Sequence, residues 1–151
     1  DDMCPICHAG ARERLIWLYL SRHLPQLAAG KDPFRIAHFA PEKGLWARLS
    51  ALQGAEYRAY DLSPGRYRQG KVARQDIEDM ALADGSIDLL LANHVLEHVL
   101  HPARALAEVR RVLRPGTGLA FVQVPLALRL DTHRDGGSTM AEDQRIDRFG
   151  H

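Results

Sequence analysis

The sequence predicts an α/β fold in which a mostly parallel sheet is covered on both faces by helices. Short apolar segments alternate with amphipathic ones between residues 34 and 124, a pattern typical of strands joined by right-handed helical crossovers. The run from Ile87 to Ala92 is almost entirely apolar, as expected of a strand buried on both faces. Ligands of such sheets bind outside the carboxyl ends of the strands, so we expect the site there.

Five segments have the apolar composition and the flanking turns of strands. The segment 87–92 follows an Asp-Gly turn and is the clearest, whereas 72–77 is the weakest. In chain order the expected strands are 34–39, 57–60 running into Asp61, 72–77, 87–92 and 118–124.

The first expected helix spans residues 11–24. Leu15, Leu18 and Tyr19 recur there at helical spacing, and Pro25 follows. Because proline lacks the backbone N–H and its ring clashes with the preceding turn, we expect the helix to end at Pro25.

Two further helices are expected between the strands. One spans 44–54 with Gly54 as its C-terminal cap, and the other begins at Pro102 and stops at the Arg-Pro-Gly sequence 114–116. Their apolar faces are predicted to be Leu45, Leu49 and Leu52 in the first and Leu106, Val109 and Leu113 in the second.

Composition and charge exclude several classes of function. The chain has 151 residues, about one domain, and its 20 basic and 19 acidic residues give a net charge of +1. A nucleic-acid binder or a protein of anionic membranes would carry a charge excess, so the basic run over 66–74 is interpreted as a solvated loop. With 46 % hydrophobic residues the chain is not globally disordered. No stretch is long enough to span a bilayer and no secretory signal opens the chain, so a cytoplasmic protein is expected.

The loop after the first strand reads Ala40-Pro41-Glu42-Lys43-Gly44. A dinucleotide site would have a glycine-rich loop here, open to a pyrophosphate. Pro41 instead removes one donor N–H, and Glu42 would repel a diphosphate. The residues suit a ligand that has an adenosine, no phosphate and positive charge, as S-adenosylmethionine does. A plain helix-start carboxylate is the alternative for Glu42.

Two aspartates follow the next two strands. Asp61 stands 21 residues after Ala40, close to the usual offset of the acidic residue that binds ribose hydroxyls. Asp76 ends the third strand and is a candidate for the adenine amino group. An aspartate that caps the Ser-Pro-Gly turn at 63–65 is the alternative for Asp61.

Six motifs stand in order along the expected fold. They are Phe39-Ala40-Pro41-Glu42, Asp61, Gln75-Asp76-Ile77, Asp84-Gly85-Ser86-Ile87-Asp88, Asn93-His94-Val95-Leu96-Glu97-His98 and Glu108-Val109-Arg110-Arg111-Val112-Leu113-Arg114-Pro115-Gly116. Together they resemble the class I S-adenosylmethionine-dependent methyltransferases, in the branch called type 11. The resemblance covers about residues 34–125 and is most specific over 84–116.

The resemblance implies a Rossmann-like three-layer sandwich of seven strands that binds the cofactor across the ends of strands one, two and four. The sequence departs from the family's glycine-rich first motif, because His38 stands at the acidic position, Ala40 at the first glycine and Glu42 at the second; only Gly44 matches. The cofactor-binding residues it implies are Phe39, Ala40, Pro41, Glu42, Gly44, Asp61, Leu62, Asp76, Ile77, Asn93 and His94.

The segment His94 to His98 also matches the H-x-x-E-H signature of inverted zinc proteases. The motif directly follows a buried strand and Pro102 leaves it about two turns, so a protease is disfavoured. In the methyltransferase interpretation His94 is the candidate general base, because a pKa near neutrality suits proton abstraction. Glu97 and His98 remain open as alternatives for that role or as structural residues.

Cys4-Pro5-Ile6-Cys7 is half of a zinc ribbon. Structural zinc requires four ligands, so either a second pair lies upstream or the thiols are free, and no metal ligand is assigned. The expected organisation is a turn and helix over 1–30, a cofactor-binding core over 31–125 and a polar loop or tail over 126–151.

The function expected from the sequence is methyl transfer from S-adenosylmethionine, leaving S-adenosylhomocysteine, to an unidentified acceptor for which a small molecule is favoured. The alternative is a methyltransferase-like module that binds a cofactor or a partner without catalysis. With five strands where the resembled fold has seven, we also expect the chain to be incomplete at both ends.

Overall fold

The fold was obtained as a computed structural model that describes residue 4 and residues 9–68 and 70–125. The tail predicted over 126–151 lies outside the described residues. The helices and strands in chain order are α1 (Ala11–Ala28), β1 (Phe34–Phe39), α2 (Lys43–Leu49), β2 (Ala55–Asp61), a 3-10 turn at Pro64–Arg66, β3 (Val72–Arg74), β4 (Leu89–Asn93), a 3-10 turn at Leu96–His98, α3 (Pro102–Val112) and β5 (Leu119–Gln123).

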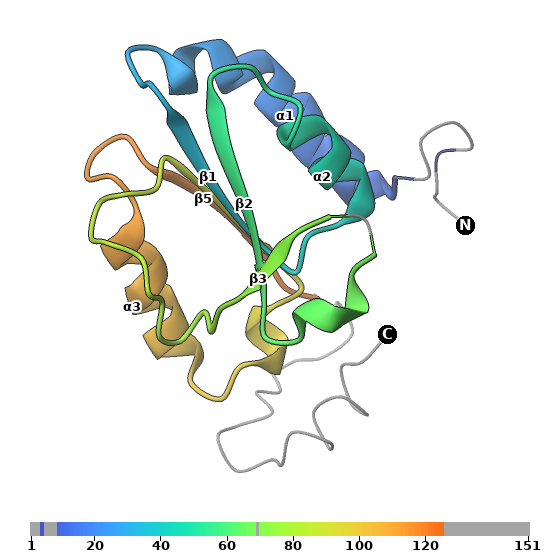
Figure 1. Cartoon of the computed structure of the whole chain (residues 1–151), viewed down its shortest axis with the longest axis vertical. Coiled ribbons are helices and arrows are strands. Elements are labelled where there is room, and N and C mark those ends of the chain that lie inside the picture. The colour runs from blue at the N-terminus through green and yellow to red at the C-terminus, as the bar shows by residue number, and fades with distance from the viewer. Residues whose placement is uncertain (1–3, 5–8, 69, 126–151) are drawn as a thin grey trace, which may run out of the picture.

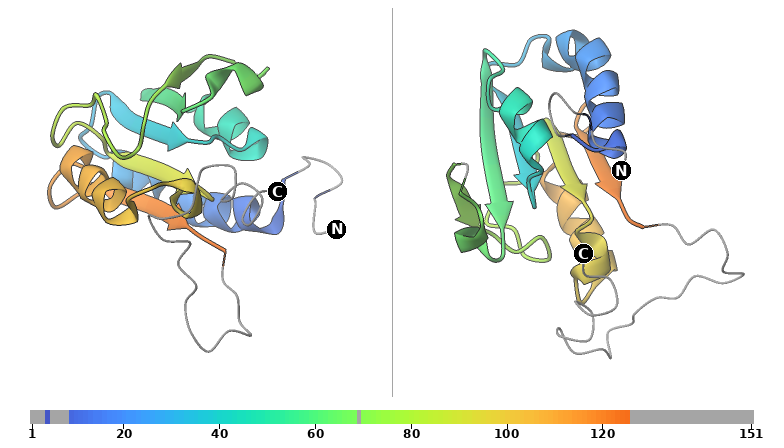
Figure 2. Two further views of the ribbon diagram at one scale, coloured as in Figure 1. Left: turned by 90° about the horizontal axis from the view of Figure 1, so that it is seen from below. Right: turned by 90° about the vertical axis from the view of Figure 1, so that its right-hand side faces the viewer.

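The five strands form one sheet in the order β3-β2-β1-β4-β5, and all four pairings between neighbours are parallel. Helices α1 and α2 lie on one face and α3 lies on the other, as Figures 1 and 2 show. The predicted α/β class, with helices on both faces of a parallel sheet, is confirmed. No helix among the described residues combines the length and the apolar character needed to cross a bilayer.

The alternation of side chains along the strands builds two cores. In β4, Leu89 and Leu91 face α1 and α2, whereas Leu90 faces α3. Strand β1 divides its side chains in the same way, with Ile36 toward the first core and Ala37 toward the second. All residues of β4 are buried, which explains why its sequence is a continuous apolar run rather than an alternating one.

The prediction that Pro25 ends the first helix is wrong, because α1 continues to Ala28 with Pro25 inside it. Leu24 and Leu27 pack against the core between α1 and the sheet, and this burial offsets the backbone hydrogen bond that proline removes. The predicted apolar face of α1 is also rotated: Ile16 and Leu20 are its buried residues, and Leu15, Leu18 and Tyr19 are exposed.

The second predicted helix is shorter than expected, since α2 ends at Leu49 with Ser50 as its C-cap. Gly54 has the expected positive φ of 74°, but it serves the entry to β2 rather than the helix end. Its carbonyl accepts a hydrogen bond from the backbone of Phe34 at the start of β1. In α3 the buried residues are Ala105, Val109 and Val112, so the prediction that Leu106 faces the core is wrong.

Arg111 in the last turn of α3 holds the long connection between β3 and β4 against that helix. Its guanidinium pairs with Glu108 on the preceding turn, with Nε 2.7 Å from Oε1, and donates to the carbonyls of Met80 and Leu82 and to Asp84. Glu108 also accepts from the backbone N–H of Met80 at 2.8 Å. The hydrogen bonds from Arg111, opposed by burial and assisted by Met80, lower the pKa of Glu108 to about 2.

We expect Glu108→Gln to lower the free energy of unfolding by about 1 kcal/mol at pH 7, because charged hydrogen bonds to Arg111 are lost. The pKa of Glu108 is lower in the folded than in the unfolded chain, so this stabilisation is present above the ordinary glutamate pKa and disappears as the pH falls toward about 2. Urea unfolding at pH 7 and at successively lower pH measures the difference.

Glu56→Gln is the control for this experiment, since Glu56 pairs with two exposed arginines, Arg35 and Arg58, and exposed pairs contribute little. A difference between wild type and Glu108→Gln that stayed constant down to pH 2 would contradict an ionic origin.

Candidate functional site

Buried polar side chains gather where β1, β2 and β4 end. Among the described residues four polar or charged side chains are buried, and three of them, His38, Asp61 and Asn93, lie at the carboxyl ends of these strands. The fourth, Asp88, precedes β4 at the opposite edge of the sheet and accepts hydrogen bonds from the Arg35 backbone and Arg114. In the described part of the chain, buried polar side chains are therefore concentrated at the carboxyl ends of these three strands.

Glu42 joins the ends of β1 and β4. Its Oε2 lies 2.7 Å from Nε2 of His38, and its Oε1 accepts a hydrogen bond of 2.9 Å from the amide of Asn93. The other ring nitrogen of His38 lies 2.8 Å from the hydroxyl of Tyr57 on β2. Glu42 occupies the N-cap position of α2, as the alternative interpretation as a helix-start carboxylate expects. Its side chain, however, makes no capping hydrogen bond.

The surroundings of Glu42 favour its ionised form. Burial raises the pKa of this carboxyl group, but the hydrogen bond and charge of His38 and the hydrogen bond of Asn93 outweigh burial and leave the pKa below its ordinary value. Burial, followed by the charge of Glu42, raises the pKa of Tyr57. Glu42 is thus a carboxylate anion, and Tyr57, on the other side of His38, keeps its hydroxyl proton.

The loop between β1 and α2 is tied to the N-terminal helix. Ala40 has a φ of 45°, a strained value for a residue with a Cβ, and its N–H is bonded to the carbonyl of Tyr60. Gly44 donates its N–H to Oε2 of Glu13 at 3.1 Å, and the other oxygen of Glu13 accepts from Gly10. Sequence reasoning missed Glu13, although a glutamate in the first turn of a helix, three residues after the N-cap, is placed to accept from the N-cap N–H.

Asp61 lies at the end of β2 and its carboxylate is already bonded. Oδ1 accepts from the backbone N–H of Ser63 at 2.7 Å, and Oδ2 accepts from Arg66 and from the hydroxyl of Tyr67, both at 2.6 Å. Burial and the bond to Asp61 raise the pKa of Tyr67 to about 12, so its hydroxyl remains a donor. The turn-capping alternative for Asp61 agrees with the contact to Ser63, and Leu62 beside it is half exposed.

Asp76 and Ile77 follow β3, which is shorter than the predicted strand 72–77. Oδ1 of Asp76 accepts the N–H of Glu78 at 2.8 Å, so this aspartate caps a turn. Ile77 is buried in the core beneath α3. Glu78 in turn accepts from the backbone N–H groups of Leu100 and His101, which joins this loop to the start of α3.

His94 directly follows β4 and has a φ of 54°. Its Nδ1 lies 3.1 Å from Oε1 of Glu97, and the guanidinium of Arg12 contacts the ring at Nε2. Leu96–His98 form a 3-10 turn rather than part of an α-helix, so His94 and His98 do not share a helical face as the protease signature requires. Among the described residues no three His, Cys, Asp or Glu side chains are grouped to hold a metal. The thiol of Cys4 is free, and Cys7 lies outside the described residues.

Three buried oxygens near these residues have no hydrogen-bond partner: Oδ1 of Asn93, Oε2 of Glu97 and Oε1 of Gln123. Asn93 and Gln123 are paired across β4 and β5, so their side chains stand next to each other at the carboxyl edge. A cavity of about 80 Å³ adjoins Gln123, and its other lining residues are Gly10, Arg12, Glu13, Glu42 and His94. Sequence reasoning missed Gln123, and its place near the end of the predicted strand 118–124 was the available signal.

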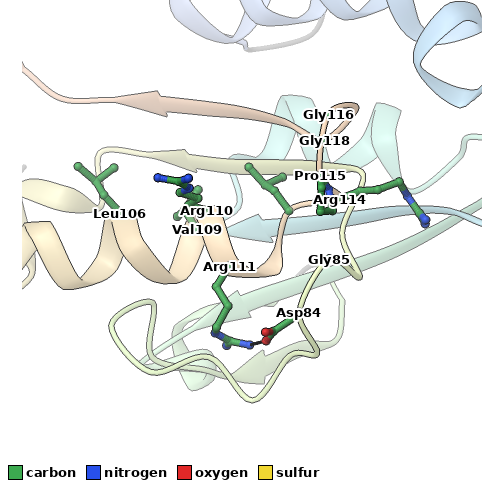
Figure 3. Close-up of a pocket in the computed structure, with 11 residues that line it drawn as sticks. Asp84, Gly85, Leu106, Val109, Arg110, Arg111, Arg114, Pro115, Gly116 and Gly118 are labelled. Carbon is green, nitrogen blue, oxygen red and sulfur yellow. Dashed lines mark hydrogen bonds and ion pairs between the residues drawn. The ribbon is translucent and has the colours of Figure 1, made fainter.

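A larger, open hollow of about 910 Å³ lies at the opposite edge of the sheet, between the end of α3 and the turns that precede β4 and β5. In Figure 3 the side chain of Arg111 points away from the other labelled residues of α3 and toward Asp84. Arg111 is thus paired with Asp84, and Arg114 is bonded to Asp88. The hollow contains none of the predicted site residues.

Residues 39–121 match the family described as the methyltransferase domain. This chain belongs to the methyltransferase domain family. The methyltransferase domain match includes the ends of β1, β2 and β4, and thus all of the predicted site residues.

Relatives of this methyltransferase domain agree with the assignment. An uncharacterized methyltransferase from Mycobacterium sp. (strain JLS) is 32 % identical over 121 residues, which are 72 % of this chain and 48 % of the relative. A Mycobacterium tuberculosis protein named as a probable S-adenosylmethionine-dependent methyltransferase is 34 % identical over 70 residues, 46 % of this chain and 25 % of that protein. The chain thus spans about half of the first relative's length and a quarter of the second's.

Solved structures support the fold alone. A Bacillus halodurans structure assigned as a methyltransferase has a TM-score of 0.51 and 20 % identity, covering 72 % of this chain and 48 % of the other. The predicted Rossmann-like architecture is thereby confirmed for the described strands.

We expect Gly44→Ala to destabilise the methyltransferase domain by about 1–3 kcal/mol. A Cβ at Gly44 would lie 2.5 Å from Oε2 of Glu13 and 2.9 Å from the Cβ of Ala9, so the contact of the first turn of α2 with Glu13 and Ala9 has to open. Urea unfolding measures the loss. Gly65→Ala is the matched control, because a Cβ at Gly65 would meet no atom within 4 Å, and equal stability of the two variants would contradict the prediction.

Proposed function

We propose that this chain is the cofactor-binding part of an S-adenosylmethionine-dependent methyltransferase. The observation that carries the proposal is the set of buried acceptor oxygens at the carboxyl edge, on Asn93, Glu97 and Gln123, beside the ionised Glu42. Buried acceptors without donors are costly, and they suit a ligand that brings N–H groups and positive charge. S-adenosylmethionine carries an α-ammonium group and a sulfonium, and no phosphate that Glu42 would repel.

The residues present fit the other parts of that cofactor. Asp61 is assigned to the ribose hydroxyls, and its Oδ2 already accepts from Arg66 and Tyr67, so hydroxyl donors would replace donors of the same kind. Asp76 and Ile77 are assigned to the adenine, the first as an acceptor for the amino group and the second as an apolar neighbour.

The remaining predicted contacts belong to the methionine half of the cofactor. The loop after β1 borders it with Phe39 through Gly44, in which Glu42 supplies the charge, and Asn93 and His94 are assigned to the vicinity of the methyl group. When bound, S-adenosylmethionine supplies an electrophilic methyl carbon and a thioether leaving group.

His94 is the proposed general base. In neutral imidazole a proton on Nδ1 that is donated to Glu97 leaves Nε2 with a lone pair, and that nitrogen would take the proton of an acceptor hydroxyl, thiol or amine as its nucleophile attacks the methyl carbon in line. Glu97 would orient the ring and stabilise the imidazolium formed. Arg12 now contacts Nε2, so Arg12 must move aside for an acceptor to enter. A small molecule remains the favoured acceptor.

We expect calorimetry to show that the protein binds S-adenosylhomocysteine, and Asp61→Asn to weaken binding at least about tenfold, as the loss of a charged hydrogen bond predicts. Asp32→Asn is the matched control, because Asp32 is exposed in the turn before β1, away from the carboxyl edge. Absence of binding to the wild type would refute the proposed function. Binding without transfer of a labelled methyl group to any candidate acceptor would favour the alternative, a binding module without catalysis.

For an acceptor identified in that way, we expect His94→Ala to reduce turnover about 10²- to 10⁴-fold, the usual contribution of a general base. His94 is assigned to the vicinity of the methyl group, which S-adenosylhomocysteine lacks, so the affinity for S-adenosylhomocysteine measured by calorimetry should fall only a few-fold. This difference separates proton transfer from cofactor binding. His23→Ala, in the second half of α1, is the matched histidine control. Unchanged turnover in His94→Ala would remove His94 from the mechanism and leave Glu97 or His98 to be tested.

A further inference from the structure

A line of polar contacts crosses three neighbouring strands beneath the site. Tyr57 comes from β2, His38 from β1 and Asn93 from β4, and Glu42 lies between the last two. The distances along the line are 2.8 Å from Tyr57 to His38, 2.7 Å from His38 to Glu42 and 2.9 Å from Asn93 to Glu42. His38 is fully buried and Asn93 is 3 % exposed, so the two donors to Glu42 are shielded from water.

The chemistry of the groups sets the direction of the two hydrogen bonds to Glu42. A carboxylate only accepts, so Nε2 of His38 carries the proton that it donates to Glu42. Nδ1 of His38 pairs with the Tyr57 hydroxyl, which donates to a neutral ring and accepts from a protonated one. On the other side Asn93 uses its amide N–H to bond Glu42, so its Oδ1 is turned away from Glu42 and is the oxygen left without a partner.

The consequence is a group of acceptor oxygens at this edge. The oxygens of Asn93 and Gln123 have no donor, and the Glu42 side chain, 26 % exposed, is the anionic group beside them. Arg12, the cation that lines the same cavity as Glu42 and Gln123, contacts the ring of His94. A primary ammonium carries three N–H donors and a positive charge, which matches this set. A ligand of the same shape without the amine would leave the oxygens unpaired.

We infer that Tyr57 and His38 are positioning residues that hold Glu42 and Asn93 in the orientation that recognises the α-ammonium group of the cofactor. Neither residue reaches the ligand in this assignment; both act through Glu42. The inference rests on the proposed function and deepens it, because it names the residues that determine how strongly the site distinguishes an amine-bearing cofactor from one without the amine.

Tyr57→Phe tests the inference with little disturbance of packing. The Tyr57 ring packs against Trp46, with ring centroids 5.8 Å apart, and phenylalanine keeps that contact while removing only the hydroxyl bonded to His38. Calorimetry measures the affinities for S-adenosylhomocysteine and for its des-amino analogue, the same thioether without the α-amino group. We expect the wild type to prefer the amine-bearing ligand by about 10- to 100-fold, the range of a charged hydrogen bond.

In Tyr57→Phe this preference is expected to fall about three- to tenfold, while the affinity for the des-amino analogue stays unchanged. Glu42→Gln is the second variant and should abolish most of the preference. Tyr60→Phe is the matched control on the same strand, because the Tyr60 side chain belongs to the core on the α3 side of the sheet, and it should keep the wild-type preference.

Each outcome decides between this role and a structural one. An unchanged preference in Tyr57→Phe, or an equal loss of affinity for both ligands, would overturn the positioning role. If the wild type bound S-adenosylhomocysteine without any preference over the des-amino analogue, the inference would fall and the proposed function would stand. If the wild type bound neither ligand, the proposed function would fall together with the inference.

Discussion

The parallel pairing of β1 with β4 is the constraint on which the rest of this structure depends. Both strands lie in the middle of the sheet and are covered on both faces, so most of their side chains are apolar. Apart from Arg35 at the start of β1, the polar residues of both strands lie near the carboxyl ends, and parallel strands end at one edge. Together with Asp61 on the neighbouring β2, His38 and Asn93 therefore place buried polarity at the carboxyl edge.

These buried groups need hydrogen-bond partners, and Glu42 is the partner of two of them. A carboxylate in the first loop accepts from His38 and Asn93 at once, whereas a glycine at this position would leave both donors unpaired. The same carboxylate excludes a diphosphate ligand and favours a cation. The two unusual residues of this region thus depend on each other. His38 near the end of β1 needs a buried acceptor, and Glu42, four residues later, provides it.

The two halves of the site differ in how their acceptors are satisfied without a ligand. At Asp61 the chain provides its own donors, from Ser63, Arg66 and Tyr67, so a ribose has to exchange with them. At Asn93 and Gln123 the side-chain oxygens lack donors, so an amine that binds there gains hydrogen bonds to these oxygens without displacing other donors from them. The amine of the cofactor is therefore expected to contribute more to the binding free energy at this edge than the ribose does.

The sequence by itself determined the α/β class, the five strands in nearly correct places and the positions of Glu42, Asp61, Asn93 and His94 at the strand ends, because alternation and apolar runs are local properties that the chain carries directly. It did not determine that α1 passes through Pro25 or that Leu106 faces solvent, since burial against a distant sheet outweighs local propensity. The partnership of His38 with Tyr57, the contact of Glu13 with Gly44 and the free oxygen of Gln123 were decided only by the tertiary structure. These contacts join residues that are between 19 and 31 positions apart or on different strands, and spacing along one sequence contains no signal for which buried donor meets which acceptor.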